Sequence, residues 1–185
     1  MKGKHNDSGK APRRSGRSRR RLRTLSLVAI AVLGIAAVAA LTLGNRGGGA
    51  SAEQIAGATG TLSAASVFHD FGLVSMKNGK VSHRYPVRND SDAPALVEQL
   101  YTSCMCTEAT LLVGGERVGP FGMQGHGYNP RIDRVIPPGQ EVVVEAVFDP
   151  NAHGPAGIGR NDRAVILRMG GQRMLQLEFT ANVTP

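Results

Sequence analysis

Leu175-Gln176-Leu177-Glu178-Phe179-Thr180-Ala181-Asn182-Val183 is the stretch of this chain that decides its fold class. An apolar side chain stands at every second position, and a polar side chain stands at each position between. Because successive side chains of a β-strand point to opposite faces, this alternation predicts a strand with one buried face and one solvated face.

The same two-residue period returns elsewhere in the C-terminal part of the chain. Apolar side chains alternate at 81–87 and at 142–148, and shorter apolar runs occur at 62–68, 96–104, 107–113 and 164–169. Turn-forming sequences such as Pro137-Pro138-Gly139 separate these runs. About seven short strands without a long helical period predict an all-β fold, an immunoglobulin-like β-sandwich, over residues 62–185.

Four short motifs in this region follow one another in a characteristic order. They are Phe68-His69-Asp70-Phe71-Gly72, Asp92-Ala93-Pro94-Ala95, Thr102-Ser103-Cys104-Met105-Cys106-Thr107 and Pro138-Gly139. In this order they resemble the bacterial immunoglobulin-like family 1573 of the domains of unknown function, over about residues 66–183. The chain departs from that pattern in three places. His69 interrupts the first motif, Ala95 stands where the family prefers a larger aliphatic residue, and Met105 replaces a glycine. The resemblance implies an immunoglobulin-like fold and no established activity.

The charge of the chain is concentrated at one end. Residues 1–23 carry ten Lys and Arg against one acid, whereas residues 47–185 carry 11 Lys and Arg against 13 Asp and Glu. The folded part is therefore slightly acidic, which argues against nucleic-acid binding by it.

Residues 25–43 follow the basic run and contain 19 residues without a charge. As a helix they would span about 28 Å, close to the hydrocarbon thickness of a bilayer. The flanking arginines predict a basic cytoplasmic tail at 1–24, a single transmembrane helix at 25–43 and a C-terminal part outside the cytoplasm. A cleaved signal peptide is the competing interpretation, although its apolar region is usually only about 7–15 residues long. Glycine and alanine then predict a flexible stalk at 44–61.

Cys104 and Cys106 are the two cysteines of the chain. In a strand they would point to one face about 6.5–7 Å apart, near the limit for a disulfide. Thiolates and thioethers suit Cu(I), so a soft-metal site would use Cys104 and Cys106 with Met123 and His126. The competing interpretation, which we favour from sequence alone, is that both cysteines are small buried hydrophobes.

Residues 114–129 contain six glycines and do not follow the strand period. Long glycine-rich loops are uncommon in compact domains and are often functional, so this segment is the predicted partner-binding surface. Its candidate contact residues are Arg117, Phe121, Met123, His126 and Tyr128. His69 and His153 lie in predicted turns and are expected to face solvent.

Sequence patterns of hydrolases, nucleotide-binding loops and zinc proteases are absent. The sequence therefore predicts a non-catalytic binding or scaffolding module, held at the cell membrane and facing an extracytoplasmic protein partner. It predicts no cofactor. The alternative function is the handling of copper or another soft metal through the Cys-Met-Cys segment.

Overall fold

The structure is a computed structural model that describes residues 52–127 and 129–185. The predicted tail, the predicted transmembrane helix, residues 44–51 of the predicted stalk and Tyr128 lie outside the described residues. Among the helices of the described residues, none has the length and apolar character needed to cross a bilayer.

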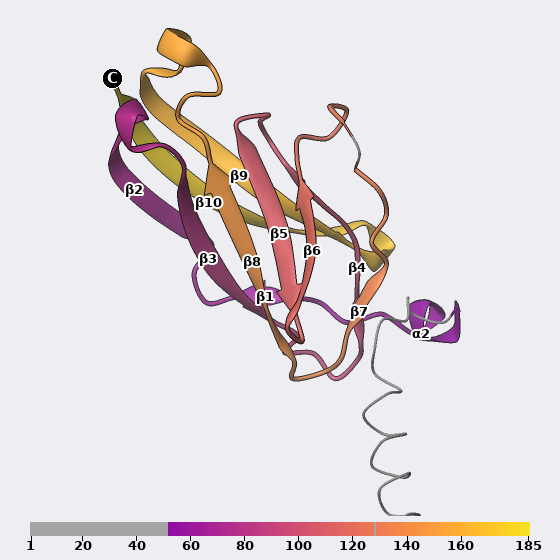
Figure 1. The fold of residues 1–185 in the computed structure, drawn as a ribbon. Helices are drawn as coiled ribbons and strands as arrows, with labels where there is room; N and C mark the ends of the chain where they lie inside the picture. Colours follow the sequence, from indigo (N-terminus) through magenta and orange to yellow (C-terminus); the bar gives the residue numbers. More distant parts are fainter. Residues whose placement is uncertain (1–51, 128) are drawn as a thin grey trace, which may run out of the picture. The chain divides into compact units, whose positions relative to one another are not determined.

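Two five-stranded sheets make up the domain (Figure 1). In the first sheet the order is β1-β3-β8-β5-β6, and in the second it is β2-β10-β9-β4-β7. The strands are β1 (Ser63–Ala64), β2 (Phe68–Ser75), β3 (Val81–Arg88), β4 (Ala95–Thr102), β5 (Thr107–Val113), β6 (Glu116–Phe121), β7 (Arg134–Ile136), β8 (Glu141–Phe148), β9 (Gly159–Met169) and β10 (Arg173–Thr184). The helical pieces are α2 (Ala52–Ala56), η1 (Met76–Asn78), η2 (Gly154–Gly157) and η3 (Gly170–Gln172).

The prediction of an all-β, two-sheet fold is confirmed, but the expected number of strands is too low. β1 and β7 contain two and three residues, which is too short for an alternation to be recognised. β6 lies inside the segment that was expected to be a loop.

The core lies between the two sheets. Leu177, Phe179, Ala181 and Val183 of β10 are all buried, as the opening stretch of sequence predicts. Across from β10, Tyr85 of β3 is fully buried, and its hydroxyl donates to the backbone oxygen of Glu178 at 2.8 Å. This bond satisfies the one polar atom of a large core side chain, as burial requires.

The last residues of the predicted stalk pack on the domain. Ala58 is buried, and the backbone N–H of Gly60 donates to the backbone oxygen of Pro94 at 2.8 Å. A Cβ at Gly60 would lie 2.1 Å from the backbone oxygen of Ala93, so the close approach requires glycine. Residues 58–61 of the predicted stalk therefore contact the domain.

The glycine-rich segment is also more regular than expected. Gly114 and Gly115 have φ of 56° and 84° and form the turn between β5 and β6, a conformation that glycine adopts without strain. Phe121 ends β6 opposite Ala109 and is only 7% exposed, so the expectation of an exposed Phe121 is wrong.

Strand pairing brings two loops to one end of the sandwich. β5 and β8 are antiparallel, with Thr107 opposite Phe148. The residues that precede Thr107 therefore meet the residues that follow Phe148. The backbone N–H of Asp149 donates to the backbone oxygen of Cys106 at 2.9 Å, which joins the two loops directly.

Candidate metal centre

Cys104 and Cys106 lie in the tight turn between β4 and β5. The backbone N–H of Thr107 donates to the backbone oxygen of Cys104 at 3.1 Å, which closes the turn. The hydroxyl of Thr102 lies 2.9 Å from the same oxygen and 3.0 Å from that of Thr107. Because the cysteines are in a turn, the separation expected for a strand does not apply to them.

His153 of the loop between β8 and β9 completes a group of three ligands. Its Nε2 lies 3.2 Å from the Sγ of Cys104. The two sulfurs and one imidazole nitrogen all lie within 4.8 Å of one another. Cys106 is 2% exposed, Cys104 is half-buried and His153 is exposed, so the group extends from the core to the surface. The expected burial is therefore right for Cys106 and wrong for Cys104.

Two N–H donors approach the sulfurs from the protein side. The backbone N–H of Cys106 donates to the Sγ of Cys104 at 3.3 Å. The Nε of Arg163, on β9, donates to the Sγ of Cys106 at 3.1 Å. Donation of this kind stabilises negative charge on sulfur.

The two thiols therefore differ in acidity. Burial alone would raise the pKa of Cys104, but hydrogen bonds with Cys106 and His153, together with the charge of Arg163, lower it from 9.0 to about 7. Burial raises the pKa of Cys106, and its hydrogen bond with Cys104 acts in the same direction against donation from Arg163. Of the two thiols, that of Cys104 therefore loses its proton more readily than that of Cys106.

This set of donors fits a soft metal ion. Thiolate sulfur and imidazole nitrogen are both ligands of copper, and thiolates in particular select Cu(I). Structural zinc sites almost always have four protein ligands, whereas this group supplies three. The arrangement can also hold a reactive thiolate, since Cys104 is both accessible and acidic.

The structure brings together only some of the residues predicted for the metal site. Cys104 and Cys106 come together, but the imidazole beside them is that of His153 and not that of His126. Met123 forms a parallel bridge with Thr102 next to the cysteine turn and is half-buried. His126 is exposed, and its backbone N–H donates to the backbone oxygen of Met123 at 3.1 Å.

The residues predicted for partner binding also differ in their surroundings. An ion pair of 2.6 Å joins Arg117 to Glu145, whose other oxygen accepts from Arg84 at 2.9 Å. Phe121 belongs to the core. Met123 and His126 keep accessible surface, and Tyr128 is outside the described residues.

Sequence reasoning missed His153 and Arg163. His153 stands 47 positions after Cys106, and only the pairing of β5 with β8 brings its loop to the cysteine turn. The apolar residues of 107–113 and 142–148 predict two strands, but they do not indicate that these strands are neighbours. Arg163 sits near the start of β9, before the apolar run at 164–169, and no local pattern marks it as a partner of sulfur.

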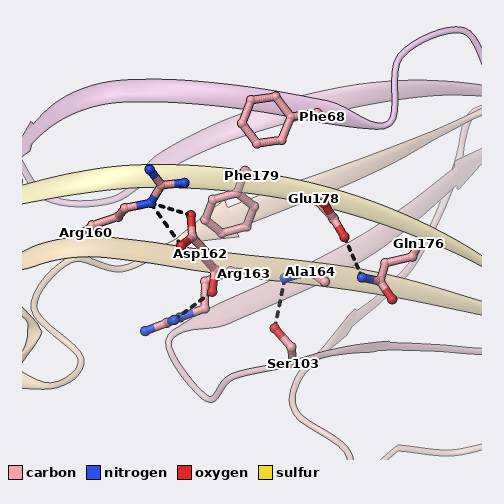
Figure 2. Close-up of a pocket in the computed structure, with 9 residues that line it drawn as sticks. All are labelled: Phe68, Ser103, Arg160, Asp162, Arg163, Ala164, Gln176, Glu178 and Phe179. Atoms are coloured by element: carbon pink, nitrogen blue, oxygen red, sulfur yellow. Dashed lines mark hydrogen bonds and ion pairs between the residues drawn. The ribbon is translucent and has the colours of Figure 1, made fainter.

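A shallow pocket of about 360 Å³ adjoins this group on the second sheet. Its walls include Ser103 and Arg163 (Figure 2). Ser103 precedes Cys104 in the chain, and the Nε of Arg163 donates to the Sγ of Cys106. Four of the polar side chains of the walls form two pairs (Figure 2): Arg160 with Asp162 at 3.0 Å, and Gln176 with Glu178 at 2.6 Å. This pocket is therefore part of the surface around the three candidate ligands and not a separate site.

Comparison with known proteins gives distant likeness of structure alone. No protein-family model matches the chain, and no curated protein matches it. A protein of unknown function from Porphyromonas gingivalis W83 is 15% identical with a TM-score of 0.49, over 69% of this chain and 48% of that one. The VesB protease of Vibrio cholerae is 12% identical with a TM-score of 0.41, over 66% of this chain and 31% of that one. The CupB6 tip adhesin of Pseudomonas aeruginosa is 12% identical with a TM-score of 0.39, over 69% of this chain and 44% of that one. The chain thus spans less than half the length of each.

Proposed function

We propose that this chain is a non-catalytic, membrane-anchored, extracytoplasmic protein that binds one soft metal ion, foremost Cu(I), through Cys104, Cys106 and His153. The observation that carries the proposal is the gathering of two sulfurs and one imidazole nitrogen within 4.8 Å. Accessible Cys104 and His153 give an ion a path from solvent, while buried Cys106 gives it a fixed partner. Donors of these types hold Cu(I) more readily than hard cations.

The second part of the proposal is the location of the protein: a membrane anchor with the domain outside the cytoplasm. The support for it is the uncharged stretch at 25–43 behind the dense arginines of 1–23. The immunoglobulin-like character of the domain is proposed from the order of its sequence motifs. Protease added outside spheroplasts should digest the domain and spare the basic tail. Protection of the domain would refute this topology, and a mature protein beginning at Glu53 would show a cleaved signal peptide.

A protein-binding or scaffolding role is the second candidate function. The observation that favours it is the exposed apolar surface of β2, which is an edge strand of its sheet. Phe68 and Leu73 of β2 are 50% and 76% exposed, and Val67, which precedes the strand, is 45% exposed. Edge strands with such side chains can pair with strands of other proteins. Leu73→Lys should then weaken capture of a membrane-fraction partner without changing metal binding.

The metal function is tested by anaerobic titration of the reduced, full-length chain in detergent against a chromogenic Cu(I) chelator. The wild-type protein should bind about one Cu(I) per chain, and the double variant Cys104→Ser, Cys106→Ser should lose this binding because thiolates dominate the site. Met105→Leu is the matched control, since it removes the exposed thioether between the cysteines and keeps both thiols. Failure of the wild-type protein to compete with the chelator would refute the metal function.

A further inference from the structure

Arg163 lacks the carboxylate partner that most arginines of the domain have. Within residues 52–127 and 129–185, no ion pair joins its guanidinium to an Asp or Glu, whereas neighbouring Arg160 pairs with Asp162 at 3.0 Å. Its Nε instead points at the sulfur of Cys106 at 3.1 Å. Because an anion stabilises a half-buried guanidinium, the thiolates that form when the proposed centre binds a metal ion would supply its counter-charge.

The protein also fixes the position of this cation. Nη1 of Arg163 donates to the backbone oxygen of Asp162 at 2.8 Å, and Nη2 donates to Oδ1 of Asn161 at 2.6 Å. The side chain of Asn161 is itself buried, and its amide donates to the backbone oxygens of Gly157 and Gly159 at 2.8 and 2.9 Å. A guanidinium held in this way cannot turn away when the charge beside it changes.

From this arrangement we infer that Arg163 makes the centre selective for monovalent soft cations, Cu(I) or Ag(I), over divalent ions such as Zn(II). The inference rests on the proposed metal function and names the class of ion. A metal ion displaces the protons of both thiols when it binds, so the two thiolates and a neutral imidazole then carry two negative charges. A monovalent ion leaves one negative charge, which the adjacent guanidinium neutralises. A divalent ion leaves no net negative charge on the ligands, so the positive charge of Arg163 stays uncompensated in a half-buried site.

The number of ligands also favours a monovalent ion. Three donor atoms converge here, and Cu(I) and Ag(I) accept low coordination numbers, whereas zinc prefers a closed tetrahedral set. Zn(II) would have to take a further ligand from solvent on the open side of the site. Charge and coordination number therefore both favour the monovalent ion, but only the charge term depends on Arg163.

The test compares Cu(I) and Zn(II) affinities of the reduced, full-length chain in detergent, with a chromogenic competitor for each ion. Arg163→Gln removes the charge, Arg163→Lys keeps it, and Arg160→Gln is the matched control on the same strand. Arg163→Gln should lower the preference for Cu(I) over Zn(II) by about 10- to 100-fold, the size expected for one nearby charge. Arg163→Lys and Arg160→Gln should keep the wild-type preference within about threefold, since the charge beside sulfur is retained.

The possible failures of this experiment are distinguishable. A wild-type chain that binds no Cu(I) overturns the proposed function together with the inference. Cu(I) binding that depends on the cysteines, with an unchanged Cu(I) to Zn(II) ratio in Arg163→Gln, overturns the inference alone. Should Arg163→Gln fail to fold, Arg163→Lys decides: a folded lysine variant that retains the preference supports the role of charge, and one that loses it contradicts that role.

Discussion

The cysteine turn at 103–106 and the glycine-rich segment at 114–129 both interrupt the strand period, yet the structure uses them in opposite ways. The turn gathers partners from elsewhere in the chain: His153 from the loop after β8 and Arg163 from β9. The glycine-rich segment instead supplies an edge strand and a core side chain, Phe121. Irregular sequence alone therefore does not distinguish a turn that gathers distant side chains from a segment that joins a sheet, because strand pairing decides between them.

The largest expected effect tests the structural role of the glycine-rich segment. Phe121→Ala should lower the free energy of unfolding by about 3–5 kcal/mol, since it deletes a buried aromatic ring and leaves a cavity. His126→Ala, in the same segment but exposed, should change it by less than about 0.5 kcal/mol. Denaturant unfolding of both variants provides the comparison, and equal small effects would mean that the segment is a dispensable loop after all.

The next prediction tests whether His153 or His126 binds the metal ion. His153→Ala should weaken Cu(I) binding by about 10- to 100-fold, or about 1.4–2.8 kcal/mol, because it removes one of the three proposed ligands. His126→Ala should leave the Cu(I) affinity within about threefold of wild type. The competition titration measures both, and a larger loss for His126 than for His153 would restore the site expected from sequence.

A smaller effect is expected at Glu145, which ties β6 to β3 across the first sheet. Hydrogen bonds from Arg117 and Arg84 hold the pKa of this carboxyl below its ordinary value of 4.5. Such a group contributes stability above its unfolded-state pKa, and the contribution is lost as the pH falls through the lower folded-state value. Glu145→Gln should therefore cost about 1–2 kcal/mol at pH 7.

The pH dependence provides the control for this substitution. The difference in unfolding free energy between wild type and Glu145→Gln should be constant from neutral pH down to about 5, then shrink in more acidic solution. A difference that persists undiminished through the acid range would assign the cost to packing and not to charge.

The smallest expected effect concerns the two thiols within the turn. Cys104, with a pKa of about 7 and a half-exposed sulfur, should react with a small alkylating reagent at least about tenfold faster than Cys106 at pH 7. Its rate should rise with pH to a half-maximum near 7, because only the thiolate reacts. Mass spectrometry of the modified chain identifies the sulfur, and equal slow labelling of both cysteines would show that both are inert core residues.

The sequence was informative wherever one strand could be recognised by itself. Leu177 and Phe179, for example, are buried as their alternation predicts. The pair Cys104 and Cys106 was also recognisable, because soft donors two positions apart stand out in any chain. The partners of the pair were not recognisable, since His153 and Arg163 reach it only through the pairing of β5 with β8 and of β4 with β9.

Phe121 was assigned to a loop for a related reason. The glycines around it dominate the local composition, and β6 is too short to show a period of its own. Only the neighbouring strand β5, which places Ala109 opposite Phe121, gives this ring its place in the core. Local pattern thus identifies long strands and soft donors, whereas strand register determines which residues meet.

X-ray absorption at the copper edge of the Cu(I)-loaded, full-length chain tests the central claim most directly. The spectrum should show one copper ion bound by two sulfurs and one imidazole nitrogen, with the nitrogen contribution lost in His153→Ala and retained in His126→Ala. A copper environment made of oxygen and nitrogen ligands alone, or one that His153→Ala leaves unchanged, would contradict the assignment of Cys104, Cys106 and His153 as the metal centre.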